Sequence, residues 1–279
     1  METIHERPGD YDLEHVGDEE DVRFFVALLE SFKPARTLEL ASGTGRVTIP
    51  LALAATKLSA TVVGLEKQAA MLAEAERKRS ELPPDARSRV HFIEGDMTTW
   101  RSDDAFELIV SPCSSLCHVQ TIEAQLAAWR CAYDNLTPGG RFVVDVAMAT
   151  LPVYAESMQT PPRSTLELDS DTTDPDTGVR LMRYRCQRYL PHEQRSEVQF
   201  IYDKCGPDKV VLERYVSDYE SHVYYPRELE LLFMLAGFDV EARFGDYRKR
   251  PLKATSQRMV FVGRRPPTPA ERRHAGDHS

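Results

Sequence analysis

Short apolar runs alternate with segments of helical period over the first 150 residues of the chain. Helices are expected to begin near Asp18 and Val47 and to cover Gln68–Ser80 and Ile122–Asn135. Strands that alternate with helices at this spacing form a right-handed parallel sheet covered on both faces, so the pattern predicts an α/β fold with a doubly wound, mostly parallel sheet. The strands are expected at Thr37–Leu40, Ala60–Leu65, Val90–Ile93, Ala105–Val110 and Arg141–Val146.

The pattern changes in the next part of the chain. Residues 165–225 show no helical period, and apolar residues alternate with polar ones in Val179–Tyr189, Ser196–Tyr202 and Val210–His222. Turn-forming residues separate these stretches, and Asp169–Gly178 is one such cluster. The sequence therefore predicts an antiparallel β insertion after the fifth strand.

The last part of the chain is expected to return to the main sheet. A helix over Arg227–Ala236 and strands over Phe238–Phe244 and Arg258–Val262 bring the sheet to seven strands. The expected organisation is a core with an N-terminal cap helix at residues 1–150, the insertion on the substrate side at 151–225, the C-terminal helix and last strands at 226–264, and a Pro- and Arg-rich disordered tail at 265–279.

Composition narrows the classes of function. The formal charge of −9 at pH 7 argues against an electrostatic nucleic-acid binder, because phosphate contacts need clustered Lys and Arg. No stretch approaches the length of a membrane span, and the N-terminus lacks the apolar run of an export signal. Five cysteines, an odd number, predict reduced thiols in a cytoplasmic protein. Cys113, Cys117 and His118 lack the second Cys/His pair of a zinc site, so no metal is expected.

The segment Thr37–Arg46 reads Thr-Leu-Glu-Leu-Ala-Ser-Gly-Thr-Gly-Arg and predicts a strand, a tight turn and the start of a helix. Gly43 and Gly45 let the backbone approach a ligand closely, and free amides at the helix start can bind its polar groups. Glu39 adds a carboxylate beneath the turn, which would repel a polyphosphate and attract an amino or sulfonium group. The expected ligand is therefore partly cationic.

Further polar residues follow the next strands, at the edge where an open parallel sheet binds ligands. Glu66 ends the second strand about twenty residues after the glycine turn, the place of an acid that commonly holds the two hydroxyls of a ribose. Gly95-Asp96-Met97 follow the third strand, and Ser111–His118 follow the fourth. Met71, in the first turn of a helix, fits an adenine pocket or, more simply, the protein core.

These motifs together resemble the class I S-adenosylmethionine-dependent methyltransferases. The resemblance rests on Glu39-x-Ala-x-Gly43-x-Gly45, Glu66, Gly95-Asp96-Met97 and Leu-x-Pro138-Gly139-Gly140. It implies a Rossmann-like fold and S-adenosylmethionine as cofactor, with the methionine part on the glycine loop, the ribose on Glu66, and the adenine beside Asp96 and Met97. The cofactor-binding residues that it implies are Tyr11, Glu39, Ala41, Ser42, Gly43, Gly45, Arg46, Glu66, Lys67, Met71, Gly95, Asp96, Met97, Ser111 and Cys113.

A closer likeness lies outside the glycine loop. Tyr11-Asp12, Ser114-Ser115-x-x-His118 and the β insertion look like the bacterial small-molecule methyltransferases that include the nucleotide-linked aminosugar N-methyltransferases. Ala41 departs from the family, which usually has glycine there. Alanine is tolerable at that position provided that its φ angle stays negative.

Two residues are candidates for catalysis. Methyl transfer needs an oriented acceptor and, where the nucleophile carries a proton, removal of that proton. His118 is the candidate base because histidine titrates near neutrality and its loop follows the fourth strand; hydrogen bonding or packing is the alternative role. Tyr11 is expected to cover the cofactor or to orient the acceptor, and an ordinary loop tyrosine is the alternative.

The predicted function is an S-adenosylmethionine-dependent methyltransferase that acts on a small-molecule acceptor, at an amine nitrogen, by in-line transfer. An O-methyltransferase and a non-catalytic S-adenosylmethionine-binding protein are the alternatives. A nicotinamide-dependent oxidoreductase is disfavoured, because Thr48 stands where its third glycine would be and Glu39 would lie under a pyrophosphate. The expected partner is the acceptor, with neither nucleic acid nor membrane, and a homodimer is left open.

The β insertion is expected to roof the methyl-transfer pocket and to contact the acceptor, although no motif within it identifies that molecule. Its first alternating stretch carries a row of arginines. These suit either an anion-binding face or a solvated face with cross-strand pairs to nearby carboxylates. The four residues of the row are Arg180, Arg183, Arg185 and Arg188.

Overall fold

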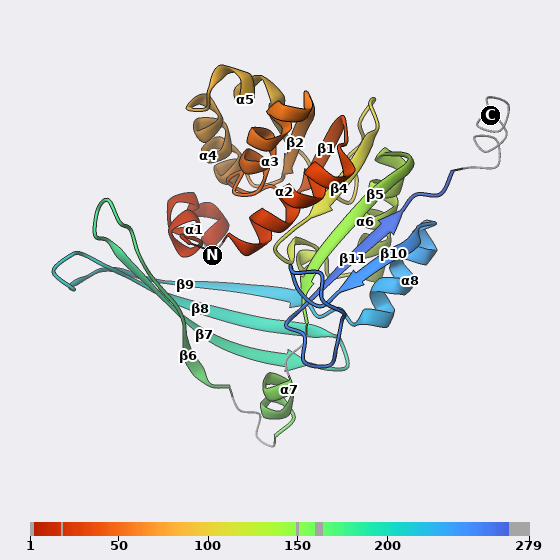
Figure 1. Ribbon diagram of the computed structural model, residues 1–279. Coiled ribbons are helices and arrows are strands. Elements are labelled where there is room, and N and C mark those ends of the chain that lie inside the picture. The colour runs from red at the N-terminus through yellow and green to blue at the C-terminus, as the bar shows by residue number, and fades with distance from the viewer. Residues whose placement is uncertain (1–2, 18, 149–150, 160–163, 268–279) are drawn as a thin grey trace, which may run out of the picture. The chain divides into compact units, whose positions relative to one another are not determined.

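The computed structural model describes residues 3–17, 19–148, 151–159 and 164–267 (Figure 1). Contacts within the chain divide it into two compact units. The antiparallel unit combines residues 1–19 with residues 149–223, and the parallel unit combines residues 20–148 with residues 224–279.

A seven-stranded sheet forms the centre of the parallel unit, in the order β10-β11-β5-β4-β1-β2-β3. The five strands from β5 to β3 run parallel, and β11 is antiparallel to both of its neighbours. This arrangement confirms the predicted fold class. The strands are β1 (Arg36–Leu40), β2 (Thr61–Glu66), β3 (Val90–Glu94), β4 (Phe106–Ser111), β5 (Leu136–Ala147), β10 (Asp239–Phe244) and β11 (Arg258–Arg264).

Helices cover both faces of this sheet. On one face, Phe25 of α2 and Leu51 of α3 pack in a cluster with the sheet, and on the other face Trp129 of α6 packs against Phe233 of α8. The sheet is therefore buried on both sides, which explains its nearly continuous apolar strands. The helices are α2 (Glu20–Phe32), α3 (Thr48–Ala55), α4 (Ala69–Ser80), α5 (Pro84–Arg89), α6 (Ile122–Asn135) and α8 (Pro226–Ala236), with the 3₁₀ turns η2 (Thr56–Leu58) and η3 (Ser115–His118).

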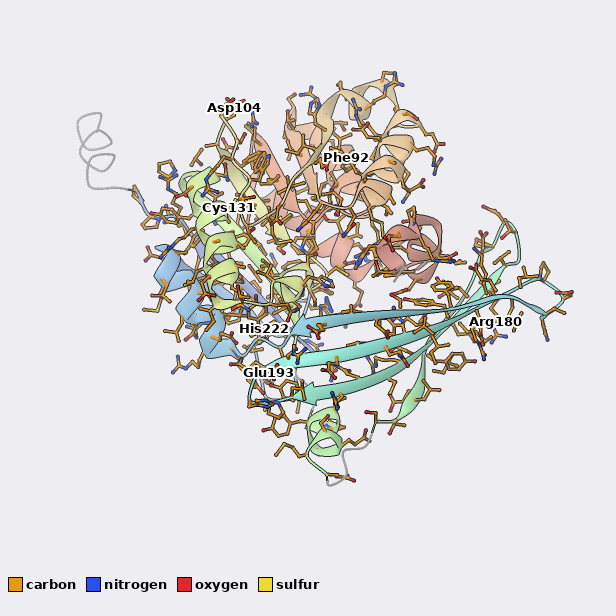
Figure 2. All side chains as sticks on the ribbon, turned by 180° about the vertical axis from the view of Figure 1, so that it is seen from behind. Phe92, Asp104, Cys131, Arg180, Glu193 and His222 are labelled. Atoms are coloured by element: carbon orange, nitrogen blue, oxygen red, sulfur yellow. The ribbon has the colours of Figure 1, made fainter. Side chains whose placement is uncertain are left out.

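The antiparallel unit is a four-stranded sheet in the order β6-β7-β8-β9. Figure 2 shows Arg180 at one end of this sheet and Glu193 and His222 at the other. The unit contains η1 (Ile4–Glu6), α1 (Pro8–Glu14), α7 (Leu151–Ser157), β6 (Leu166–Thr173), β7 (Arg180–Leu190), β8 (Arg195–Cys205) and β9 (Val211–His222).

The strand β6 differs from the prediction, which assigned Asp169–Gly178 to a turn. The strand continues to Thr173 because its acidic residues pair with the arginines of β7. Asp169 Oδ1 lies 3.1 Å from Arg185 Nη1, and Asp171 Oδ1 accepts a hydrogen bond of 2.6 Å from Arg180 Nε. The row of arginines is therefore a set of cross-strand ion pairs, the second of the two interpretations.

The N-terminal residues differ from the prediction in a second way. Sequence grouped them with the core, whereas α1 packs against the antiparallel sheet, where Ile4 and Leu13 join a buried cluster with β7 and β8. Lys204 Nζ donates to Asp10 Oδ1 at 2.6 Å, and Tyr202 Oη donates to Glu14 Oε2 at 2.9 Å. These partners lie almost 200 positions away in the chain, so the packing of the polar N-terminus could not be predicted from its own sequence.

The C-terminal segment extends the sheet further than expected. Arg264 belongs to β11, and the amide of Arg265 donates to the carbonyl of Gly140 at 2.8 Å, so the order continues into the predicted tail. Residues 268–279, the remainder of that tail, lie outside the described residues. Among the helices that the structure describes, none is long and apolar enough to cross a membrane.

Candidate functional site

The glycine loop joins β1 to α3 at the carboxyl edge of the parallel sheet. Gly43 and Gly45 have φ angles of 56° and 80°, a region that glycine enters without strain. A β-carbon at Gly45 would lie 2.8 Å from Cζ of Phe92, a residue of β3 labelled in Figure 2. Both the backbone angle and the available space therefore require glycine at this position.

Ala41 does not have the negative φ angle that its side chain was expected to require. Its φ is 54°, in the left-handed region, where the methyl group crowds the following carbonyl oxygen. The glycine that the family usually has at this position would relieve this strain. The loop thus holds an L-residue in a conformation that its own sequence disfavours.

The variant Ala41→Gly is expected to unfold at higher denaturant concentration, with a gain in the free energy of unfolding of about 1 kcal/mol. The gain is smaller than the strain itself because glycine also loses more entropy on folding. Ala54→Gly, within α3, serves as the control and should lower the stability by about 1 kcal/mol. A loss of stability in both variants would show that Ala41 is not strained.

Glu39 lies beneath the glycine loop and is buried, with its carboxylate accepting a hydrogen bond from Thr48 Oγ1. Burial raises the pKa of Glu39 to about 8, against the hydrogen bond from Thr48 and the charge of Arg46, which lower it. The sequence predicted an ionised carboxylate at this position. Because the pKa of Glu39 is about 8, its side chain is instead mainly protonated near neutral pH when no ligand is bound. A cationic ligand nearby would favour the ionised form.

Glu66, at the end of β2, connects two loops of the carboxyl edge. Its Oε2 accepts a hydrogen bond of 2.7 Å from the Gly43 amide. Its Oε1 accepts bonds of 2.9 and 2.7 Å from the amides of Lys67 and Gln68. The acid expected to hold a ribose therefore also fixes the glycine loop.

The variant Glu66→Ala is expected to weaken the binding of S-adenosylhomocysteine by about 1 to 3 kcal/mol, because the ligand loses a charged partner and the glycine loop loses its anchor. Titration calorimetry measures this change. Glu94→Ala is the matched control, since Glu94 pairs with Glu66 in the register of β2 and β3 and is exposed. Equal affinities for wild type and Glu66→Ala would mean that the ribose is held elsewhere.

The loop after β3 lies beside Glu66. Asp96 accepts hydrogen bonds from Lys67 Nζ at 2.8 Å and from Thr98 Oγ1 at 2.7 Å. Burial works against the ionised form, but these bonds hold the pKa of Asp96 at about 2, so it remains a carboxylate. Gly95 is packed against Leu65 and Trp100, while Met97 is half-buried against the core and Met71 is fully buried.

Two buried hydroxyl groups at this edge have no hydrogen-bond partner in the described part of the chain. They belong to Ser42 in the glycine loop and to Ser111 at the end of β4. A buried hydroxyl without a partner costs about 1 to 3 kcal/mol, and such groups mark places where a polar ligand binds. Together with the glycine loop and Glu66, they fit the polar groups of a nucleoside-linked amino acid.

Arg46, the residue after the glycine turn, pairs with Asp21 of α2. Its Nη1 donates to Asp21 Oδ1 at 3.0 Å, and Nη2 donates to Oδ2. Burial pushes the pKa of Asp21 up, but these hydrogen bonds lower it below its usual value. The guanidinium of Arg46 thus fixes the start of α3 against α2.

The sequence did not identify a second buried charge at this edge, which is Asp145 near the end of β5. It is fully buried and forms a two-point ion pair with Arg258, with both N–O distances at 3.0 Å. The signal was present in the sequence, because Asp145 is the only charged residue in the apolar run Phe142-Val-Val-Asp-Val146. A lone charge in a buried strand needs a partner, and that partner comes from β11.

The candidate catalytic residues lie in different units. His118 ends the turn η3 after β4 and is exposed, at the carboxyl edge of the parallel unit. Tyr11 lies in α1 of the antiparallel unit, where its ring centroid is 4.4 Å from that of His15. Tyr11 is therefore a helical residue rather than a loop residue.

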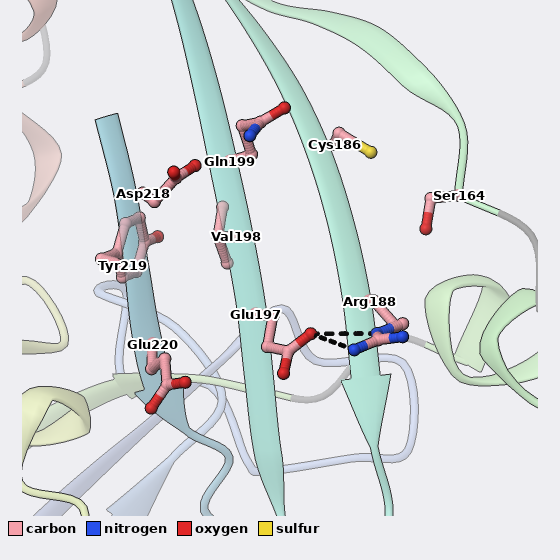
Figure 3. A pocket seen from close by; sticks show the side chains of 9 residues that line it. All are labelled: Ser164, Cys186, Arg188, Glu197, Val198, Gln199, Asp218, Tyr219 and Glu220. Carbon is pink, nitrogen blue, oxygen red and sulfur yellow. Dashed lines mark hydrogen bonds and ion pairs between the residues drawn. The ribbon is translucent and has the colours of Figure 1, made fainter. Parts of the chain in front are cut away.

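The antiparallel unit has a cavity of its own, of about 540 Å³ (Figure 3). Arg188, Glu197 and Glu220 lie side by side on β7, β8 and β9, and Arg188 Nε donates to Glu197 Oε2 at 2.9 Å. Asp218 adds a third carboxylate to the lining. Arg195 also pairs with two of these carboxylates, with Glu220 through Nη1 and with Glu197 Oε1 through Nη2 at 3.6 Å, so the three acidic groups face two guanidinium groups.

A comparison with known protein families identifies a domain within the parallel unit. A family model described as a methyltransferase domain matches residues 37–140, which contain the glycine loop, Glu66, Asp96 and Ser111. Residues 37–140 therefore match a methyltransferase domain. This confirms the resemblance drawn from the motifs and the expectation of an enzyme of this class. None of the curated proteins with which the chain was compared matches it.

Solved structures with the same fold include several methyltransferases. The CcbJ methyltransferase from Streptomyces caelestis is 24% identical over 88% of this chain and 90% of its own, with a TM-score of 0.71. The sugar N-methyltransferase KedS8 from a Streptoalloteichus species is 18% identical over 92% of both chains, with a TM-score of 0.66. CalS10 from Micromonospora echinaspora, an amino pentose methyltransferase solved with S-adenosylmethionine bound, is 18% identical over 88% of this chain and 91% of its own, with a TM-score of 0.65. The likeness covers 88 to 92% of this chain and shows that the chain has the same fold as these three structures.

Proposed function

We propose that the chain is an S-adenosylmethionine-dependent methyltransferase that methylates an amine nitrogen of a small molecule. The observation that carries the proposal is the carboxyl edge of the sheet within residues 37–140, where Glu66 anchors the glycine loop and where Ser111 ends β4, the strand beside β1. Support for the amine comes from the sugar N-methyltransferase and the amino pentose methyltransferase that share the fold.

Different residues at the carboxyl edge are proposed to bind different parts of the cofactor. The cofactor, when bound, supplies a methyl group already activated by its sulfonium. Glu66 would hold the ribose hydroxyls, the amides of the glycine loop would hold the methionine end, and Asp96 would hold the adenine. Glu39, beneath the loop, would balance the positive charge, since a buried carboxylate and a cation stabilise each other in a medium of low dielectric constant.

His118 and Tyr11 are proposed to act on the acceptor. An amine must be neutral to attack, so His118 would take the proton that an ammonium group carries into the site. Tyr11 would orient the acceptor. The antiparallel unit is proposed to supply the other contacts to the acceptor.

The protein is proposed to act in the cytoplasm on a small molecule and not on nucleic acid, which agrees with its formal charge of −9. Both a monomer and a homodimer are compatible with this activity.

The test of this function is the formation of S-adenosylhomocysteine by the purified chain with a panel of amino sugars and other small amines, followed by mass spectrometry. The expected product gains one methyl group on nitrogen. Methylation of hydroxyl acceptors alone would favour the O-methyltransferase. Binding of the cofactor with no turnover on any acceptor would favour the non-catalytic alternative.

A further inference from the structure

Asp145 holds the loop that follows β4, which we call the β4 loop and which comprises residues 112–118. The Asp145 carboxylate accepts a hydrogen bond of 3.1 Å from the Cys113 amide, and its carbonyl accepts one of 3.0 Å from the Ser114 amide. Ser114 Oγ in turn accepts a bond of 2.9 Å from the Ala147 amide. Three hydrogen bonds thus tie the start of the β4 loop to the end of β5.

The backbone that these bonds hold is strained. Cys113 and Ser114 have φ angles of 55° and 60°, two successive residues with side chains in the left-handed region. Such conformations persist only where the surrounding structure fixes them, and they concentrate at functional sites. Released from Asp145, the β4 loop would relax toward negative φ angles and move η3, which ends at His118.

Two further residues hold Asp145 itself. Besides the ion pair with Arg258, Tyr247 Oη donates to Asp145 Oδ2 at 2.8 Å. The guanidinium of Arg258 lies over the Tyr247 ring, 4.9 Å from its centroid, and this ring is 5.6 Å from that of Phe24 in α2. The carboxylate is therefore fixed by groups from the β10–β11 connection and from β11.

Stability alone gives no reason for this arrangement. A buried ion pair adds little net stability compared with apolar residues of similar volume, because both charges lose their hydration. An apolar residue at position 145 would also leave the Cys113 amide without its acceptor. The buried charge is accounted for if the β4 loop must keep one strained conformation.

We propose that Asp145 is a positioning residue for methyl transfer: with Arg258 and Tyr247 it fixes the β4 loop, and through that loop it places His118 at the carboxyl edge of the sheet. This inference rests on the proposed function and assigns Asp145 no contact with the cofactor or the acceptor. It predicts that loss of the carboxylate lowers turnover more than it lowers affinity for the cofactor.

The test compares Asp145→Asn, Tyr247→Phe and Glu241→Gln. Asp145→Asn is expected to lower kcat by about tenfold to a hundredfold through misplacement of the β4 loop. Tyr247→Phe, which removes one hydrogen bond and leaves the ion pair, is expected to lower kcat by roughly threefold. If Asp145→Asn fails to fold, Tyr247→Phe still tests the proposal, because it is the milder substitution. The affinity for S-adenosylhomocysteine should change by less than about threefold in either variant, because Glu66 and the glycine loop are untouched.

Glu241→Gln is the matched control. Glu241 pairs with Arg141 near the middle of β5, with Arg141 Nε 2.6 Å from Glu241 Oε2, and this variant should keep the kcat of the wild type. Unchanged kcat in Asp145→Asn, or a loss of cofactor affinity as large as the loss of kcat, would overturn the proposal.

Hydrogen exchange separates this inference from the proposed function. In Asp145→Asn the amides of the β4 loop should exchange faster than in wild type, while those of α6 keep their rates. Unchanged exchange in the β4 loop would overturn the positioning role. If the wild type transfers no methyl group to any acceptor, the proposed function fails, and the exchange rates still decide whether Asp145 fixes the loop.

Discussion

The Glu39→Gln variant is expected to be more stable than the wild type at pH 7, by about 3 kcal/mol, and no more stable than it at pH 4. The reason is the buried carboxyl group, whose pKa rises from its ordinary 4.5 to about 8 on folding. Between these two values the native state keeps a proton that the unfolded state has lost. The wild type therefore loses stability as the pH rises from 4.5 to 8, whereas glutamine has no proton to lose.

Denaturant unfolding of both proteins at several pH values between 4 and 8.5 measures this effect. Glu30→Gln is the control, because Glu30 is exposed on α2 and its substitution should leave the slope of stability with pH unchanged. If the difference between Glu39→Gln and wild type were the same at pH 4 and pH 8, folding would leave the pKa of Glu39 unchanged and the argument from burial would be wrong.

The same substitution should weaken the binding of S-adenosylmethionine. A cationic ligand favours the ionised form of Glu39, so binding near pH 7 should release a proton from this group, which calorimetry in buffers of different ionisation enthalpy detects. Opposite effects on stability and affinity are typical of a residue kept for function. A variant that gains stability and keeps full affinity would leave the buried acid without a role in binding.

The His118→Ala variant is expected to lower turnover by about a hundredfold or more if His118 is the general base. The pH profile of kcat should then lose its limb near neutrality. His118→Asn should behave in the same way, because asparagine can donate and accept hydrogen bonds but cannot take up the proton. Neither variant should alter the affinity for S-adenosylhomocysteine.

His192→Ala is the control, since His192 is exposed in the β7–β8 turn of the antiparallel unit. A small loss of turnover with an intact pH limb would reduce His118 to an orienting group. Equal turnover of wild type and both His118 variants at saturating substrate would remove its catalytic role, and Tyr11 would become the residue to examine.

The parts of the structure that rest on local patterns were predictable from the sequence. Short runs rich in apolar residues predicted the five parallel strands of the seven-stranded sheet, and Gly237, with a φ of 97°, ends α8 where the sequence indicated. The glycine loop and Glu66 were recognisable because their spacing follows from the strand-turn-helix unit itself. The glycine loop and Glu66 follow successive strands of the chain, so their positions can be predicted without knowledge of tertiary contacts.

Features that depend on distant partners were not predictable. The acidic strand β6 is poor in β-forming residues and exists because Asp169 and Asp171 meet the arginines of β7. Helices within residues 3–17 pack on the antiparallel sheet because Asp10 accepts a hydrogen bond from Lys204 and Glu14 accepts one from Tyr202. Likewise, the strain at Ala41 and the anchoring of the β4 loop by Asp145 arise from backbone geometry that no periodicity reveals.

The central claim is that the carboxyl edge of the methyltransferase domain binds S-adenosylmethionine. Titration calorimetry of the purified wild-type chain with S-adenosylhomocysteine tests it most directly, with circular dichroism to establish that the protein is folded. We predict one site per chain with a dissociation constant in the micromolar range, the usual range for such substrates, and displacement by S-adenosylmethionine. Folded protein that shows neither heat nor competition with either ligand would contradict the account.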